Sequence, residues 1–213
     1  LSSCNLRCEW LKADGKTNLC DTAYSSHFPE NEKRNISEVL EAMDHFKCKH
    51  VVITGGEPYL QPQLPALIEE IKKRDHFVTV ETNGTIYMPT KADFISLSPK
   101  LASSCVKTSP HFNEHQKHRL NMGTLVEFII KHDFQFKFVV NDPGDIKEIE
   151  GVQKYLEGFV DESFTDKIYL MPQAITKDEL MKSSLEVADW AKTKSWNYTD
   201  RLHLRLWGPK RGV

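Results

Sequence analysis

The chain has 213 residues, of which 39% are hydrophobic and 27% charged, an ordinary globular composition with enough apolar residues for one good-sized core. The formal net charge of −2 excludes the bulk positive field on which general nucleic-acid binding depends. No apolar run approaches the roughly 20 residues that span a bilayer, so no membrane partner is expected.

Cysteines cluster at the start of the chain. Cys4, Cys8 and Cys20 are three of only five, and an odd, clustered set argues against a disulfide framework and favours a reducing cytoplasm. Three thiolates can hold a [4Fe-4S] cluster and leave one iron open for an exogenous ligand. The alternative is a structural zinc site, for which His27 is the nearest candidate fourth ligand.

Downstream of the cysteines, helical and strand patterns alternate. Residues 29–35 are polar and predict an exposed connection, after which Ser37 is placed to cap a helix. Apolar residues at helical spacing predict helices over 36–46, 64–73, 120–132, 146–159 and 178–194. Runs of β-branched, aromatic or alternating apolar residues predict strands over 51–54, 77–81, 94–98, 136–140, 168–171 and 202–207. The strand at 51–54 is expected to be buried, and no element is assigned to 101–118.

This alternation predicts an α/β domain that spans residues 1–213. Helices between successive strands imply a parallel sheet with the helices outside, and right-handed crossovers would curl the sheet toward a barrel. Chemistry in such folds lies at the carboxyl ends of the strands. Polar or glycine-containing residues follow four of the predicted strands, at 54–57, 81–83, 98–100 and 171–173. We therefore expect a site built from several strand ends.

Gly55-Gly56-Glu57-Pro58 directly follows a predicted strand. Two residues without side chains allow the backbone to approach a ligand closely, such as an amino-acid-like head group. A tight turn leading into the next helix is the alternative interpretation.

The three-cysteine loop and Gly55–Pro58 together resemble the radical S-adenosylmethionine superfamily. The resemblance narrows to the 7-carboxy-7-deazaguanine synthase family through the motifs at 20–22, 52–58, 81–85, 96–100 and 206–213. It implies an incomplete TIM-type βα barrel of parallel strands with outer helices. It also implies a lyase that converts 6-carboxy-5,6,7,8-tetrahydropterin to 7-carboxy-7-deazaguanine, with loss of ammonia, on the route to queuosine. In this family, electron transfer from the cluster cleaves the cofactor to a deoxyadenosyl radical.

The resemblance also implies roles for individual residues. Cys4, Cys8 and Cys20 would ligate the [4Fe-4S] cluster, and the hydroxyl of Thr22 would meet a Mg²⁺ ion. S-adenosylmethionine would contact Asp21, Gly56, Glu57, Ser98, Pro99, Lys100, Met171, Pro172, Gln173 and Ala174. The pterin substrate would contact Thr54, His203 and the carboxylate of Val213. A homodimer and a flavodoxin-type electron donor are the implied partners.

Two departures from the family pattern are visible. Eleven residues separate Cys8 from Cys20, nine more than the family usually has, and the polar stretch 12–18 predicts a surface excursion whose closure costs little entropy. The family's amino-terminal segment would lie before Leu1, and we expect it to be missing from this sequence. Two rivals remain, a radical enzyme that activates a partner protein by making a glycyl radical and a non-catalytic zinc-binding module.

Overall fold

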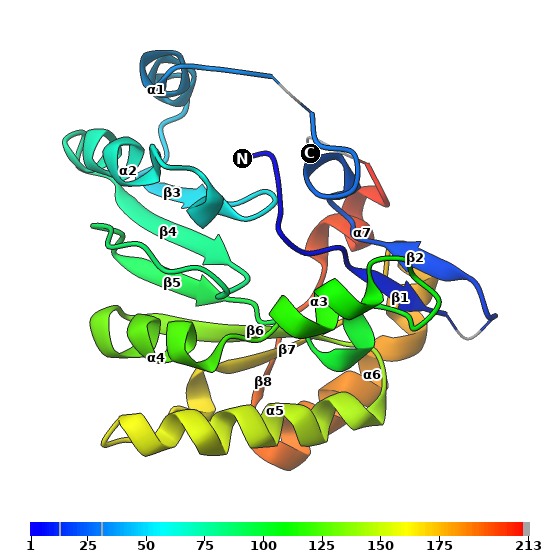
Figure 1. Ribbon diagram of the computed structural model, residues 1–213. Coiled ribbons are helices and arrows are strands. Elements are labelled where there is room, and N and C mark those ends of the chain that lie inside the picture. The colour runs from blue at the N-terminus through cyan, green and yellow to red at the C-terminus, as the bar shows by residue number, and fades with distance from the viewer. Residues whose placement is uncertain (13, 31, 211–213) are drawn as a thin grey trace.

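The computed structural model describes residues 1–12, 14–30 and 32–210. Its centre is a sheet of six strands that are all parallel and follow one another in space as they do in the chain (Figure 1). The strands are β3 (His50–Ile53), β4 (Phe77–Thr82), β5 (Phe94–Leu97), β6 (Phe134–Val140), β7 (Ile168–Pro172) and β8 (Asn197–Tyr198). Within the described residues β3 and β8 are the two edges, so the predicted incomplete barrel is confirmed as an open sheet.

In the described part of the chain, five longer helices and two short ones accompany the sheet. They are α1 (Ile36–Asp44), α2 (Leu64–Lys72), α3 (Phe112–His118), α4 (Met122–Lys131), α5 (Pro143–Leu156), α6 (Lys177–Lys194) and α7 (Leu202–Trp207). Short 3-10 turns are η1 (Ala23–Ser25), η2 (Pro58–Leu60), η3 (Ala102–Ser104), η4 (Glu157–Phe159) and η5 (Thr165–Lys167). Among the residues that the structure describes, no helix lies between β4 and β5, so strict alternation fails at that crossover. None of the helices in the described ranges is long and apolar enough to cross a membrane.

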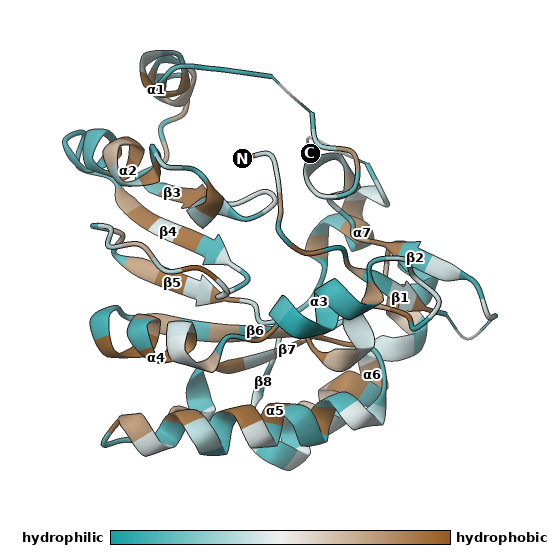
Figure 2. Ribbon diagram, viewed as in Figure 1, coloured by the Kyte–Doolittle hydropathy of each residue, from teal (hydrophilic) through white to brown (hydrophobic). Residues whose placement is uncertain are grey.

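The main core lies between the helices and one face of the sheet. Strand β6 alternates fully between buried and half-buried residues, because helices cover only one of its faces. Its buried side chains Phe134, Phe136 and Phe138 join inward residues of α4 and α5 such as Phe128 and Ile149. Figure 2 shows the matching split on α5, with brown and teal residues on opposite sides of the helix. The opposite face of the sheet is free to carry polar side chains.

Helix starts follow local capping chemistry. Asn35, rather than the predicted Ser37, caps α1, and it forms a reciprocal capping box with Glu38. Asp142 caps α5 in the same way with Asp145, and Pro143 occupies the first turn. The helix therefore begins three residues before the predicted start at 146.

Two of the predicted strands differ from the structure. Residues 202–207 form helix α7 instead of the predicted final strand, and the last strand is the two-residue β8. Leu202 and Leu206 share the exposed side of α7 while Leu204 is buried, so the Leu-x-Leu-x-Leu alternation does not mark a sheet face. Strand β3 is an edge rather than a buried strand, since Val52 keeps 53% of its surface exposed.

The predicted surface excursion is an ordered hairpin. Strand β1 (Glu9–Leu11) pairs antiparallel with β2 (Thr17–Leu19). Gly15 takes φ = +79° in the connecting turn, a left-handed conformation that favours glycine at this place in a hairpin loop. In Figure 1 this hairpin, the N-terminal segment and α7 lie on the side toward which β4 and β5 point. The cysteine segment therefore faces the carboxyl ends of the strands.

Candidate functional site

The hairpin brings the second and third cysteines together. Glu9 pairs with Leu19, and one step further the N–H of Cys20 donates to the carbonyl oxygen of Cys8 at 3.1 Å. Eleven intervening residues therefore leave the two cysteines opposite each other. The base of the hairpin is docked on α6, because Glu179 accepts a hydrogen bond from Asn18 and pairs with Lys12 at 2.8 Å.

The three thiols form a soft donor set in a poorly hydrated place. Cys8 is buried, Cys4 and Cys20 are half-buried, and all are free thiols. Burial raises the pKa of the Cys4 thiol and raises the pKa of Cys8 well above its usual value, while the nearby Lys100 cation opposes both shifts. Thiolates in such a site are stabilised when they bind iron. This donor set fits a [4Fe-4S] cluster.

A single zinc ion fits less well. Across residues 1–12, 14–30 and 32–210, no group of three or more His, Cys, Asp or Glu side chains is arranged to hold one metal ion. His27, the candidate fourth ligand, lies with Nε2 3.0 Å from the carbonyl oxygen of Cys8 and so bonds to backbone. A four-iron cluster is larger than one ion and takes its thiolates at separate corners, so wider spacing suits it.

Backbone contacts hold the loop between Cys4 and Cys8. His115 is 2% exposed, and its Nδ1 accepts from the N–H of Arg7 at 3.3 Å. Its Nε2 lies 2.8 Å from Ser104 Oγ, which itself donates to the Leu101 carbonyl. Burial lowers the pKa of His115 to about 4, with the Arg119 charge adding to the shift, so the ring is neutral and can accept from the loop. No sequence pattern indicated that His115 holds the cysteine loop.

Glu57 fastens two strand ends rather than pointing to solvent. Its fully buried carboxylate accepts from Thr82 Oγ1 and the Asn83 N–H at 2.7 Å each, and from the Tyr59 N–H at 3.0 Å. Burial raises its pKa, and these donors oppose that shift. Asn83 in turn donates to Asn5 Oδ1 at 2.9 Å, which ties the end of β4 to the cysteine loop.

The two glycines before Glu57 are required by the chain itself. A Cβ on Gly56 would lie 2.0 Å from the Ser3 carbonyl oxygen and 2.8 Å from that of Ser25. The N–H groups of Gly56 and Glu57 donate to the carbonyls of Leu1 and Ser3. The backbone that comes close to these two glycines in the structure is thus that of the N-terminal segment.

Lys100 supplies the positive charge of this rim. Its Nζ donates to the backbone and side-chain oxygens of Ser98, at 2.9 Å each, while Pro99 between them is buried. The Lys100 charge also contributes, as a lesser cause, to the lowered pKa of the Asp21 and Glu81 carboxyls, and it opposes the rise in the pKa of Glu57 that burial causes. Lys100 therefore faces the interior of the predicted site.

Arg201 links the cysteine loop to the end of β7, and sequence reasoning missed it. Its Nη1 lies 2.5 Å from Asp21 Oδ2, and its Nε donates to the Pro172 carbonyl oxygen at 3.0 Å. Burial raises the pKa of Asp21, but the charge and hydrogen bond of Arg201 outweigh it and leave the pKa below its usual value. The side chain of Arg201 is only 7% exposed, so the pair fixes the position of Asp21.

A cavity of about 490 Å³ gathers several predicted residues. Cys20, Asp21 and Thr22 line it from the cysteine loop, Ala174 from beyond β7, and His203 from α7. The Thr22 hydroxyl lies 3.2 Å from Cys20 Sγ. Met171 and Gln173 flank the same strand end, where the Gln173 N–H donates to the Val140 carbonyl. His203 reaches the cavity although its segment is a helix rather than the predicted strand.

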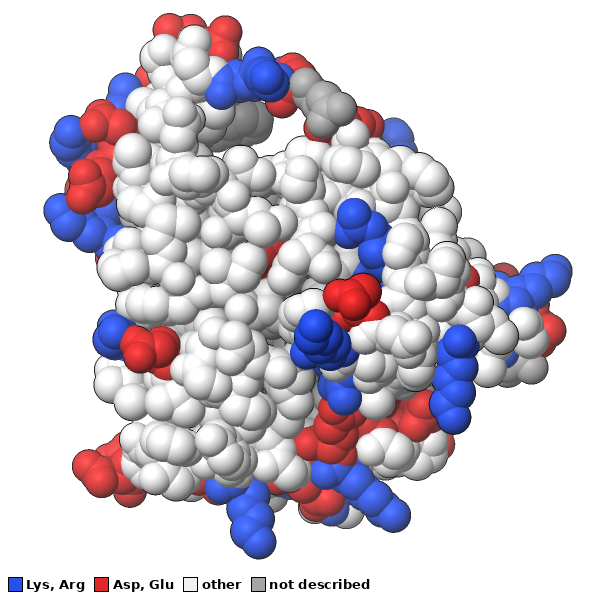
Figure 3. All heavy atoms as spheres, in the orientation of Figure 1, with Lys and Arg blue, Asp and Glu red and all other residues white. Residues whose placement is uncertain are grey.

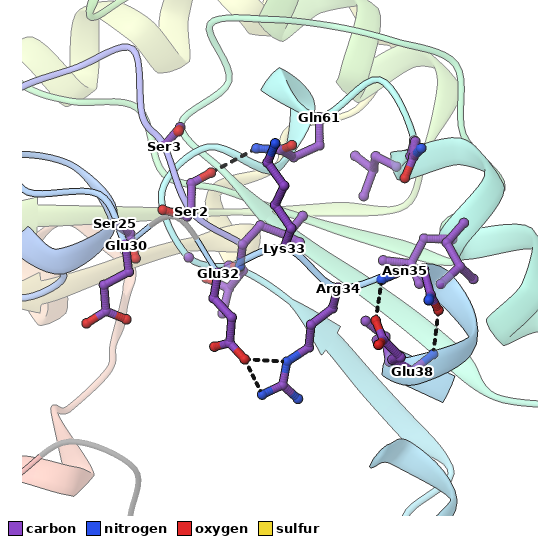
Figure 4. A pocket seen from close by; sticks show the side chains of 18 of the residues that line it. Ser2, Ser3, Ser25, Glu30, Glu32, Lys33, Arg34, Asn35, Glu38 and Gln61 are labelled. Atoms are coloured by element: carbon purple, nitrogen blue, oxygen red, sulfur yellow. Dashed lines mark hydrogen bonds and ion pairs between the residues drawn. The ribbon is translucent and has the colours of Figure 1, made fainter. Parts of the chain in front are cut away.

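A second, larger cavity of about 1440 Å³ is lined on one side by residues 32–35, which lead into α1 (Figure 4). Thr54 lines it and donates to Glu81 Oε2 at 3.0 Å, and Glu81 pairs with Lys137. Figure 3 shows the opening between this segment and the body, with acidic and basic side chains interspersed around that face. Tyr24 lines both cavities, so the two cavities adjoin there. Thr54 lines the larger cavity, whereas Thr22 and His203 line the smaller one. Val213 lies outside the described residues.

Comparison with known proteins gives one consistent family. Residues 2–99 match the family model described as the radical SAM superfamily. The chain is 34% identical to 7-carboxy-7-deazaguanine synthase of Rhodopirellula baltica, over all of this chain and 79% of that protein. It is 35% identical to 7-carboxy-7-deazaguanine synthase of Halobacterium salinarum, over 97% of this chain and 80% of that protein.

Solved structures agree on the fold. QueE from Escherichia coli superposes with a TM-score of 0.58 at 16% identity, covering 93% of this chain and 92% of that one. Streptococcus suis SuiB bound to S-adenosylmethionine also gives 0.58, at 12% identity, over 93% of this chain and 48% of that one. At these identities the likeness concerns the fold alone.

Proposed function

Because this chain belongs to the 7-carboxy-7-deazaguanine synthase family of radical S-adenosylmethionine proteins, we propose that it converts 6-carboxy-5,6,7,8-tetrahydropterin to 7-carboxy-7-deazaguanine with loss of ammonia. This reaction lies on the route to queuosine. The observation that carries the proposal is the placement of Cys4, Cys8 and Cys20 against the carboxyl ends of a parallel sheet.

Membership of the family implies a [4Fe-4S] cluster and S-adenosylmethionine. When bound, these two supply the radical chemistry that removes a hydrogen atom from the substrate. The residues of the chain have the task of holding and shielding them. Cys4, Cys8 and Cys20 would ligate the iron, and the Lys100 cation would favour their thiolate forms.

We propose that residues around the smaller cavity and the neighbouring strand ends bind S-adenosylmethionine. They are Asp21, Gly56, Glu57, Ser98, Pro99, Lys100, Met171, Pro172, Gln173 and Ala174. Arg201 supports two of them, because it joins Asp21 to the Pro172 carbonyl. Since the Glu57 carboxylate is fully engaged within the protein, its side chain would hold the strand ends in place for the cofactor and would not itself accept from it.

We propose that Thr22 offers its hydroxyl oxygen to Mg²⁺, which suits a hard cation that prefers oxygen ligands. The hydroxyl lines the cavity and lies 3.2 Å from Cys20 Sγ, so it can donate its proton to that sulfur while an oxygen lone pair is offered to the metal. His203 lines the same cavity, and Thr54 the adjoining one. We propose these two residues, with the Val213 carboxylate, as substrate contacts.

On the family resemblance alone, we also propose that residues 1–213 form one domain of a homodimeric cytoplasmic enzyme. A flavodoxin-type protein would donate electrons. Neither nucleic acid nor membrane is a partner in this proposal, in keeping with the interspersed charge in Figure 3.

Anaerobic incubation with S-adenosylmethionine, a reductant and the carboxy-tetrahydropterin, followed by mass analysis, tests the proposal. The expected result is 7-carboxy-7-deazaguanine, with iron and sulfide present in equal amounts at about four each per chain. Cofactor cleavage without consumption of the pterin would favour an enzyme that makes glycyl radicals. Stoichiometric zinc without sulfide would favour a zinc-binding module.

A further inference from the structure

One face of the β1–β2 hairpin is part of the site. Side chains alternate along a strand, so Trp10 shares a face with Cys8, and their partners across the ladder are Asn18 and Cys20. Trp10 is 5% exposed and Asn18 is 4% exposed, whereas Leu11 on the opposite face is 53% exposed. The hairpin that accommodates the extra residues therefore forms a wall behind the cysteines, and is more than a surface excursion.

Trp10 lies directly among the cysteines. It forms a small apolar cluster with Leu6 and Cys8, and Cys4 and Cys20 pack against that cluster. This is separate from the main core between the sheet and its helices. The indole ring consequently belongs to the same packed cluster as the three thiols.

The indole N–H of Trp10 is buried and has no hydrogen-bond partner in the described part of the chain. Its neighbour across the ladder, Asn18, is satisfied by the Glu179 carboxylate at 3.2 Å. A buried donor left unpaired costs about 1–3 kcal/mol, so such groups are rare unless a bound group supplies the acceptor. Next to three thiols, the acceptor at hand is sulfur.

We propose that the indole N–H of Trp10 donates a hydrogen bond to a sulfur of the cluster held by Cys4, Cys8 and Cys20, and thereby raises its reduction potential. The inference rests on the proposed function, since it needs the cluster to be present. A hydrogen bond to a cluster sulfur stabilises the reduced state, which carries one more negative charge. The hairpin thus holds Cys20 opposite Cys8 and keeps the Trp10 donor beside both.

Two replacements at position 10 remove the donor. Trp10→Phe deletes the N–H and part of the ring, and incorporation of benzothienylalanine keeps the ring volume but puts sulfur in place of the N–H. Leu11→Ala, on the exposed face of β1, is the matched control. Each protein is reconstituted anaerobically, and the cluster is titrated while the reduced state is followed by electron paramagnetic resonance.

The expected result is a more negative potential for both replacements with unchanged iron and sulfide content, and no shift for Leu11→Ala. The sign is informative, because opening the pocket to water would stabilise the more highly charged reduced cluster and raise the potential instead. An unchanged or more positive potential for the benzothienyl variant would overturn the proposal. A shift seen only with S-adenosylmethionine bound would assign the N–H to the cofactor and also overturn it.

The wild-type protein gives an independent readout if the variants lose iron. With ¹⁵N-tryptophan, the reduced cluster should show a coupled indole nitrogen and a proton that exchanges in D₂O. Absence of both couplings would contradict the proposal while leaving the enzyme function intact. A wild-type protein that binds no iron and sulfide at all would instead remove the proposed function.

Discussion

Replacing Arg201 with methionine should destabilise the protein because two interactions of this side chain are lost. Methionine keeps much of the apolar stem but loses both the ion pair with Asp21 and the hydrogen bond to the Pro172 carbonyl. Breaking a fully buried ion pair by removing one partner costs about 3–5 kcal/mol. The Asp21 side chain is 43% exposed, so water can solvate the abandoned carboxylate and the cost falls to about 2 kcal/mol. For a chain of this length that is a loss of about 4–8 °C in Tm.

Arg205→Met is the matched control, in helix α7, which begins directly after Arg201. Arg205 pairs with Asp200, but both side chains remain about a third exposed, so the expected loss is no more than about 1 kcal/mol. Thermal unfolding of wild type and both variants, loaded with cluster in the same way, measures the difference. Equal losses for Arg201→Met and Arg205→Met would refute the idea that Arg201 is a buried link.

The same pair has a pH signature. The pKa of Asp21 in the folded protein lies below the usual 3.8. The Asp21 carboxylate therefore stabilises the fold at pH values above 3.8, and this stabilisation is lost as the pH falls through the folded-state pKa. The stability gap between wild type and Arg201→Met should therefore narrow in acid, below about pH 4. A gap that stayed constant there would mean that the ion pair is not its source. The variant should also need more S-adenosylmethionine for half-maximal cleavage, because Asp21 and the β7 end would no longer be tied.

Three further outcomes are expected. Cys20→Ala should abolish reductive cleavage of S-adenosylmethionine, measured as 5′-deoxyadenosine; persistent cleavage would mean that Cys20 is not a cluster ligand. Thr22→Ala should lower turnover and weaken its dependence on Mg²⁺, and an unchanged response in a Mg²⁺ titration would remove Thr22 from the metal site. Gly56→Ala should lower the free energy of unfolding by about 2 kcal/mol or more, because a Cβ there meets two backbone carbonyls. Gly151→Ala, in the middle of α5 with nothing near its added Cβ, should instead raise that free energy by about 0.5–1 kcal/mol, and urea unfolding compares the two.

What the sequence could predict depends on how local each signal is. The runs 77–81 and 168–171 mark β4 and β7 almost to the residue, because β-branched and apolar stretches between turn residues carry that information themselves. Cys20, Asp21 and Thr22, which the sequence motif proposed as neighbouring site residues, all line one cavity. Arg201 escaped notice because its partner is 180 residues away, and no local pattern encodes such a contact. The strand predicted for 202–207 was wrong because six residues of alternating leucine also suit a helix with one buried turn.

The spacing between Cys8 and Cys20 shows that the number of residues between two cysteines does not by itself determine how far apart the cysteines lie in the fold. Lengthening that connection from two residues to eleven adds about 1.5 kcal/mol of closure entropy if the loop is unstructured. The β1–β2 ladder and the contacts of Lys12 and Asn18 with Glu179 order the loop, and they place Cys20 across from Cys8 whatever lies beyond. What the cluster requires is proximity of the thiols at the base of the hairpin. It follows that shortening the turn around Gly15 should be tolerated by the cysteines, whereas any change that slips the register by one residue would turn Cys20 to the opposite face.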